Sequence, residues 1–471
     1  SANISGNIVA TGNIATSANV NVGANVNTAN LYATGMANVI GNLDVHGTLN
    51  GVDGIFTGNV SANNLNTNSV VSNGNISGSN LNASGNVVAV GNIQTSNGIL
   101  ATGNIKGANI MSLGNTISYG NVVANLSLFG NGLAVTGTAN IIGTANVQGN
   151  LSVSNLAVTG AEANLGGANV TTTGNSQTYS GAVTLTTNTT LTDAGNILFS
   201  STVDGAYALT IVNTGSGNIT FTGAVGGTTP LTGIDITTNA LTAAAISSSG
   251  TLSVANSGTS SITGIISNGS SALAVTKAGS GTLTLSGANS YTGATNVDAG
   301  TLTVSGTLSD STAVTVASGA TYNVNASDTV GSIAGAGTIT TTAASGTVTL
   351  SAGNDNTSTS FTGVLQNGSN ALLALTKVGS GTLTLSGANS YTGGTTVSAG
   401  TLSLGASNVL ANTGAVSISG GTLAIGANSD TVGAVTLSSG SITGTTGVLT
   451  GSSYSVTNSS GTTTISAKLA G

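Results

Sequence analysis

Ionisable side chains are almost missing from this sequence of 471 residues. Charged residues make up 3% of the chain, whereas an ordinary soluble protein contains about 25%. There is no arginine, and the lysines are Lys106, Lys277, Lys377 and Lys468. Proteins that bind nucleic acid neutralise phosphates with many cations, so we expect no nucleic-acid partner. The net charge of −7 is small for this length.

Cysteine is absent, and Pro230 is the single proline. Without cysteine the chain can form neither disulfides nor thiolate metal sites. No run of eighteen apolar residues occurs, so we expect no membrane-spanning segment. Glutamate, lysine, arginine and glutamine, which favour helices, are too rare to predict a helix of useful length. An all-β fold is therefore expected.

The residues that are present alternate in short, strand-like patterns. Glycine accounts for 72 residues, and hydrophobic residues make up 39% of the chain. A disordered chain would lack aliphatic residues in register, so we reject that interpretation. In Thr282–Leu285 and Thr301–Val304, threonine alternates with an aliphatic residue, which gives each strand one apolar face.

The segment Lys277–Val304 returns almost unchanged as Lys377–Leu404. In the first copy, Leu283 and Leu302 lie 19 residues apart, which suits one coil of a β-solenoid. We therefore predict a parallel β-helix, or β-solenoid, in which each strand pairs with its equivalent in the next coil. The aliphatic residues expected to point inward are Leu283, Leu285, Val297, Leu302, Val304, Leu383, Leu385, Val397, Leu402 and Leu404.

Each copy contains a Lys-x-Gly-x-Gly-Thr-Leu-x-Leu strand, an Asn-x-Tyr-x-Gly turn and a Val-x-x-Gly-Thr-Leu strand. The central parts, Gly279–Gly293 and Gly379–Gly393, are identical. This pattern resembles the passenger-associated transport repeat of bacterial autotransporters. The resemblance implies a right-handed parallel β-helix that type V secretion exports to the bacterial cell surface or the extracellular space.

Residues 1–170 follow a different motif, in which a small residue and then asparagine precede isoleucine, valine or leucine. The asparagines recur at six-residue steps, as at Asn7, Asn13, Asn19 and Asn25. Such a step predicts a solenoid coil with three short faces, an asparagine at each corner and the aliphatic residue inward. We expect these asparagines to adopt left-handed backbone and their side chains to form amide ladders along the axis.

Residues 171–266 show longer spacing between their strand-like segments. Within them, Gly217–Gly223 is similar to the β-helical shaft of filamentous haemagglutinin-type proteins. The sequence thus predicts three parts. These are an Asn-rich hexapeptide-like β-solenoid over 1–170, a haemagglutinin-like shaft over 171–266 and a β-helix with the two repeats over 267–471.

Few residues are candidates for chemistry. His46, the only histidine, would share a strand face with Asp44, but no Gly-x-Ser-x-Gly nucleophile motif occurs, so we expect a solvent-facing or coil-packed histidine. Asp310 and Asp328 could pair as the carboxylates of a polysaccharide-cleaving enzyme. Residues 353–356 could offer oxygen ligands to Ca²⁺. Turn residues explain both groups better, so we assign no catalytic, cofactor-binding or metal-binding residue and expect neither an enzyme nor a cofactor.

Two further patterns concern surface contacts. Tyr291 and Tyr391 occupy equivalent positions in the repeats and could contact sugar rings, but we expect each ring to pack over the corner of its coil. Threonine pairs suggest an ice-binding face, although their irregular spacing argues against it. These pairs are Thr282/Thr284, Thr301/Thr303, Thr338/Thr340 and Thr347/Thr349.

The sequence favours a non-catalytic structural protein, the shaft of a secreted adhesin or extracellular filament. A glycan-binding or ice-binding β-solenoid and a phage tail fibre segment are the alternatives, with host-surface or matrix glycans as candidate partners. Residues 1–25 and 462–467 continue the strand pattern without an evident cap. We therefore expect either that the chain continues beyond these residues or that copies associate head to tail along the solenoid axis into a filament, and we favour the second.

Overall fold

The fold consists of strands and the turns that join them. No helix occurs among the residues that the structure describes, so none there could cross a membrane, and the expected all-β fold is confirmed. The chain divides into two compact units, unit 1 (Ser1–Thr229) and unit 2 (Pro230–Gly471), which we describe separately. The predicted three-part division stays a prediction. The computed structural model describes residues 2–16, 19–33, 35–118, 122–141, 144–147, 150–160, 162–166, 169–174, 176–458 and 463–471.

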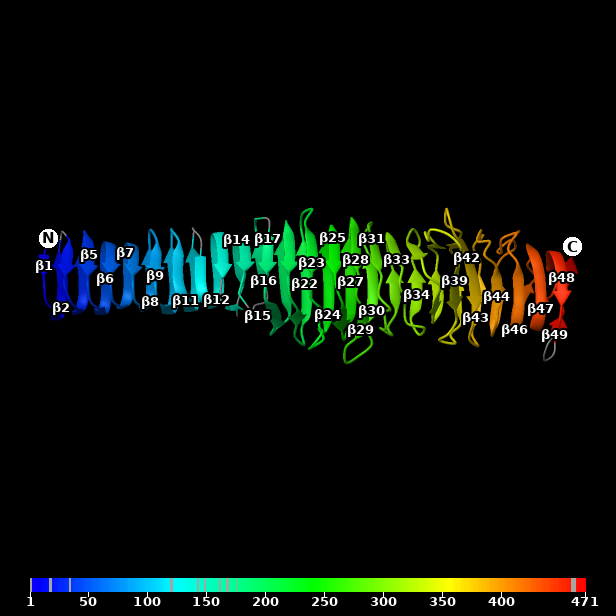
Figure 1. The fold of residues 1–471 in the computed structure, drawn as a ribbon, viewed down its shortest axis with the longest axis horizontal. Helices are drawn as coiled ribbons and strands as arrows, with labels where there is room; N and C mark the ends of the chain where they lie inside the picture. Colours follow the sequence, from blue (N-terminus) through cyan, green and yellow to red (C-terminus); the bar gives the residue numbers. More distant parts are fainter. Residues whose placement is uncertain are drawn as a thin grey trace. The chain divides into compact units, whose positions relative to one another are not determined.

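Within unit 1 the strands follow one another along the chain and stack coil on coil (Figure 1). They are β1 (Ala2–Ile4), β2 (Ile8–Thr16), β3 (Val20–Val22), β4 (Val26–Ala33), β5 (Met36–Val39), β6 (Leu43–Phe56), β7 (Val60–Ser72), β8 (Ile76–Ala83), β9 (Val87–Ala89), β10 (Ile93–Ala101), β11 (Ile105–Ser118), β12 (Val122–Ile141), β13 (Thr144–Val147), β14 (Leu151–Val158), β15 (Glu162–Leu165), β16 (Asn169–Thr172), β17 (Ser176–Tyr179), β18 (Ala182–Leu185), β19 (Thr189–Asp193), β20 (Asn196–Phe199), β21 (Val203–Asp204), β22 (Ala208–Asn213) and β23 (Asn218–Phe221).

Unit 2 has the same organisation with mostly shorter strands. They are β24 (Gly233–Thr238), β25 (Ala240–Ala243), β26 (Ile246–Ser248), β27 (Thr251–Asn256), β28 (Thr259–Ile262), β29 (Ile266–Asn268), β30 (Ala274–Ala278), β31 (Thr282–Leu285), β32 (Thr295–Val297), β33 (Thr301–Val304), β34 (Ala313–Val316), β35 (Thr321–Val324), β36 (Asp328–Val330), β37 (Ser332–Gly335), β38 (Thr338–Thr340), β39 (Thr347–Ala352), β40 (Thr359–Phe361), β41 (Val364–Leu365), β42 (Leu372–Lys377), β43 (Thr382–Leu385), β44 (Thr395–Val397), β45 (Thr401–Leu404), β46 (Val416–Gly426), β47 (Asp430–Gly444), β48 (Val448–Val456), β49 (Thr463–Ile465) and β50 (Lys468–Ala470).

In both units a strand pairs in parallel with the equivalent strand of the next coil, which confirms the predicted parallel β-solenoid. In unit 1, for example, Val26 of β4 stands beside Leu43 of β6, and Leu43 stands beside Val60 of β7. These aliphatic side chains are buried, so each column of strands contributes one apolar stripe to the core. The right-handedness stays a prediction.

An amide ladder runs along one corner of unit 1. The backbone N–H of each asparagine donates to the Oδ1 of the asparagine one coil earlier, at 2.7 to 2.9 Å. The residues joined in this way are Asn25, Asn42, Asn59, Asn75 and Asn92. A ladder is therefore present, but it differs from the predicted one, because the donor at each step is a backbone N–H and not a side-chain amide. Its partners lie 16 or 17 residues apart along the chain, so a uniform six-residue step stays a prediction.

The expectation of left-handed backbone at these corners is wrong. Within the described part of unit 1, no asparagine has a positive φ; the non-glycine residues that do are Asn356, Asn408 and Asn458 of unit 2. The physical reason is the ladder itself, because the amide oxygen bonds the next coil and the backbone can stay in its ordinary conformation. The residue before each ladder asparagine must be small, because the preceding coil lies very close to it. A Cβ added to Gly74 would lie 2.5 Å from Oδ1 of Asn59.

The two repeat copies lie on different faces of unit 2. In the first copy, β31 pairs with β33, and that column continues through β35 to β38. In the second copy, β43 stacks on β40, whose column runs back through β37 and β34 to β32. The Thr-Leu-Thr-Leu strand of the second copy thus continues the column of Thr295–Val297. All ten aliphatic residues predicted to point inward are buried.

Replacing Leu283 by aspartate tests the inward face of β31. Leu283 is fully buried, so the variant would place an unpaired charge in the core at a cost of about 3 kcal/mol or more. Thr282→Asp is the matched control, because Thr282 is only partly buried on the same strand. Urea unfolding should separate the two variants. If Leu283→Asp unfolds at the urea concentration of the parent, the assigned facing is wrong.

Replacing Gly74 by alanine tests the packing at the ladder corner. The new Cβ would meet Oδ1 of Asn59 at 2.5 Å and the backbone of Gly58 at 2.8 Å, and such overpacking typically costs about 1–3 kcal/mol. At Gly12 an added Cβ meets nothing within 4 Å, so Gly12→Ala should unfold like the parent. Equal melting temperatures for the two variants would refute the close approach at the corner.

Candidate functional site

His46 and Asp44 share a face of β6, as the sequence predicts. Nε2 of His46 lies 3.9 Å from Oδ2 of Asp44, and the side chains are 66% and 50% exposed. His46 is thus solvent-facing, which is one of the two placements expected from the sequence. The two side chains thus make an exposed surface contact of the kind that contributes little to stability.

The structure brings Asp310 and Asp328 to one shallow groove of about 320 Å³ in unit 2. Asp328 is the first residue of β36, and its carboxylate accepts the backbone N–H groups of Leu308 at 2.8 Å and Thr329 at 2.9 Å. Burial raises the pKa of Asp328 to about 6, the two hydrogen bonds partly oppose this, and the nearby charge of Asp310 adds to it. Asp310 itself is exposed in a turn.

Asp430, further along unit 2, makes the same kind of backbone contacts as Asp328. It accepts the N–H groups of Val409 and Leu410 at 2.9 Å and that of Thr431 at 2.8 Å, and burial raises its pKa as well. Downstream of each repeat, a buried aspartate therefore binds the backbone of the preceding coil. Asp310 lies 18 residues before Asp328, whereas the residue 18 positions before Asp430 is Asn412. The repeated feature is structural, and the carboxylate pair is not repeated.

Residues 353–356 form a tight turn, as expected. Gly353 and Asn356 have φ values of 119° and 62°, in the left-handed region. Oδ2 of Asp355 accepts the hydroxyl of Ser332 at 2.7 Å, and Oδ1 accepts both the N–H and the hydroxyl of Thr357. Although partial burial would raise the pKa of Asp355, these bonds and the Lys377 ammonium hold it below its ordinary value.

The lysine of each repeat is buried, which the sequence analysis did not foresee. Nζ of Lys277 donates to the carbonyl oxygens of Ala278 at 2.5 Å, Gly279 at 2.7 Å and Ala299 at 3.2 Å. Gly279 has a φ of 71°, which turns its carbonyl toward the ammonium. Burial lowers the pKa of Lys277 to about 8. Lys377 makes the equivalent bonds to Val378, Gly379 and Ala399.

The tyrosine and asparagine of the Asn-x-Tyr-x-Gly turn are also buried. The hydroxyl of Tyr291 bonds Oγ1 of Thr295 at 2.7 Å, and Tyr391 bonds Thr395 at the same distance. The expected packing of both rings is confirmed, and their burial excludes contact with a sugar ring. Asn289 binds three backbone groups: its amide donates to the carbonyls of Gly287 and Thr307 and accepts the N–H of Ile266. Asn389 makes the equivalent bonds in the second copy.

Three of the four threonine pairs share a face despite their irregular spacing. Thr282 stands beside Thr301, and the column continues through β35 to β38, which carries Thr338 and Thr340. The fourth pair lies on β39, in a different column.

The shared face does not present an even array of free hydroxyls. Thr303 and Asn323 are almost buried, and Asn323 donates to the hydroxyls of Thr303 and Thr342. The protein itself therefore uses part of the hydrogen-bonding capacity that an ice surface would need.

Comparison with known proteins agrees with this picture of the repeats. Residues 275–304 and 375–404 match the family model described as the passenger-associated-transport-repeat. The chain thus contains an autotransporter passenger β-helix repeat region, and such repeats imply secretion to the cell surface or beyond. No curated protein and no solved structure matches the chain. The likeness of Gly217–Gly223 to filamentous haemagglutinin stays a prediction.

The pH dependence of stability tests the buried lysine. Between about pH 8 and pH 10.5, the unfolded chain holds a proton on Lys277 that the folded chain has released. The free energy of unfolding of the parent therefore increases as the pH rises through this range. Lys277→Met leaves three carbonyls without their donor, at a cost of about 1–3 kcal/mol or more, and lacks this proton. The stability difference between parent and variant should therefore grow from pH 8 to pH 10.5.

Urea unfolding at several pH values measures this difference. The buried tyrosines titrate alike in both proteins and cancel. Lys106→Met, at an exposed lysine, is the control and should match the parent throughout. A parent–variant difference that stays constant or shrinks with rising pH would disprove the assignment.

Proposed function

We propose that this protein is a non-catalytic structural part of an exported passenger, a β-solenoid shaft that acts at the bacterial cell surface or outside the cell. One observation carries the proposal. The polar residues that define the repeat, Lys277, Asn289 and Tyr291, are buried and bind the backbone and side chains of their own and adjacent coils. The repeat therefore serves to hold coils together, and its defining residues are not available to a ligand.

The carboxylates support the same proposal. Asp328 and Asp430 each bind backbone N–H groups of their own and the preceding coil through their carboxylate oxygens. A general acid or base would instead need an oxygen free to reach a substrate. A shaft for an adhesin or a filament needs only stacked coils and a neutral coat, and this chain supplies both.

Export can be tested with the full chain placed between a secretion signal and an autotransporter translocator. We expect protease added to intact bacteria to cleave the chain, which would show that it is displayed outside. The double variant Lys277→Met, Lys377→Met should show less display, because both repeats lose a corner bond, whereas Lys106→Met should be displayed like the parent. A parent chain that stays protected inside the cell would refute the proposal.

The absence of catalysis is tested separately on the purified chain. We expect no release of reducing ends from a panel of neutral and acidic polysaccharides. Release that Asp310→Asn and Asp328→Asn abolish would show instead that the carboxylate pair is an active site.

A further inference from the structure

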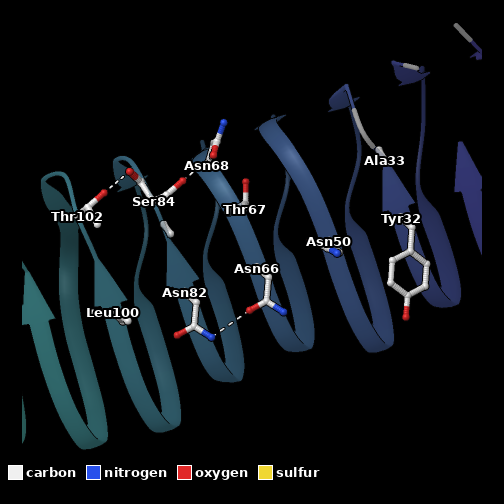
Figure 2. A pocket seen from close by; sticks show the side chains of 11 residues that line it. Tyr32, Ala33, Asn50, Asn66, Thr67, Asn68, Asn82, Ser84, Leu100 and Thr102 are labelled. Carbon is white, nitrogen blue, oxygen red and sulfur yellow. Dashed lines mark hydrogen bonds between the residues drawn. The ribbon is translucent and has the colours of Figure 1, made fainter. Parts of the chain in front are cut away.

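A groove in unit 1 crosses several consecutive coils and has a volume of about 720 Å³ (Figure 2). One row of residues runs along it, each standing beside the next in the register of adjacent strands. From β4 to β10 this row is Tyr32, Asn50, Asn66, Asn82 and Leu100. Figure 2 shows Tyr32 and Leu100 toward opposite ends and the three asparagines between them.

The residues beside this row explain why the surface is hollow there. Ala33 and Ala83 are buried and leave room where larger side chains would fill the groove. On the far side of them lie Asn68, Ser84 and Thr102, which form a polar rim. Oγ of Ser84 donates to Oδ1 of Asn68 at 2.5 Å, and the hydroxyl of Thr102 donates to the carbonyl of Ser84. Bonds between coils thus fix the rim in place.

The row offers hydrogen-bonding groups at regular intervals. Nδ2 of Asn82 donates to Oδ1 of Asn66 at 3.0 Å. The Oδ1 and the second N–H of Asn82, and both N–H groups of Asn66, therefore remain available to a ligand. Asn50 is exposed and has no side-chain hydrogen bond to another described residue. Successive coils are spaced by about 4.8 Å, which is close to the length that one pyranose adds to an extended chain.

We propose that this groove binds an extended, neutral oligosaccharide. Tyr32, 38% exposed, supplies a ring on which a sugar can stack, while Asn50, Asn66 and Asn82 bind hydroxyl groups of successive sugars. None of the described residues that line the groove carries a charge, so a charged glycan would gain no ion pair there. This binding function goes beyond the structural role proposed above and does not depend on it.

Other extended ligands fit the groove less well. A peptide that adds to a sheet needs an unpaired strand edge, but β8 is paired on one side with β7 and on the other with β10. A nucleic acid needs cations along its backbone, and none of the described residues of the lining is a cation. The groove instead provides side-chain amides and hydroxyls for hydrogen bonds, and an aromatic ring for stacking.

Isothermal titration of the full chain with cellohexaose, a straight β-1,4-linked hexasaccharide, tests the proposal. We expect one site, weaker binding of cellobiose because it spans fewer coils, and no gain in affinity for an acidic hexasaccharide of galacturonate. Tyr32→Ala should weaken cellohexaose binding about tenfold through the lost stacking. Asn66→Leu keeps the side-chain shape without its hydrogen-bonding groups and should weaken binding roughly three- to tenfold.

Tyr207→Ala is the matched control, because Tyr207 is 39% exposed in unit 1 but does not line the groove. It should bind like the parent, and the melting temperatures of all three variants should confirm that they fold. The proposal is overturned if cellohexaose, chitohexaose and maltohexaose all fail to bind at millimolar concentration. It is also overturned if the galacturonate hexasaccharide binds more tightly, or if Tyr32→Ala and Asn66→Leu leave affinity unchanged.

Discussion

Parallel pairing between equivalent strands of successive coils is the interaction on which each unit depends. It satisfies the backbone groups of the strands, but every coil must also turn corners, where N–H and C=O groups have no strand partner. The two units meet this need with different side chains. In unit 1, asparagine oxygens accept the N–H of the next coil. In unit 2, Lys277 and Lys377 of the repeats bind corner carbonyls, while Asp328 and Asp430 beyond the repeats bind corner amides.

This use of side chains accounts for the unusual composition. A coil needs small residues where it approaches its neighbour, apolar residues inside and polar residues at the corners. Surface charge contributes nothing to that arrangement, and the outward strand positions are mostly hydroxyls and amides. Five of the few charged groups are buried, namely Asp193, Lys277, Asp328, Lys377 and Asp430. Burial carries a desolvation cost, which the lowered pKa values of the lysines reflect, and the bonds to backbone groups offset part of it.

Stacking also decides what the surface can recognise. An outward position recurs in every coil, so residues 16 to 18 positions apart form continuous rows. The groove from Tyr32 to Leu100 is such a row, and it has no counterpart as a motif in the sequence. The same geometry places identical segments in different surroundings, since the Thr-Leu-Thr-Leu strands of the two repeats belong to different columns. A repeat of sequence is therefore not a repeat of surface.

The sequence by itself determined the strands, their inward faces and the solenoid class. These features follow from alternation over a few residues and from the near identity of two segments, both of which are local. It also indicated the structural character of Tyr291 and the turn at residues 353–356. Only the tertiary structure decided that Lys277 points inward, that the asparagine corners keep ordinary backbone and that Asn50, Asn66 and Asn82 line one groove. Those outcomes depend on the register between coils, which the varying lengths of the intervening turns set, and no local pattern specifies that register.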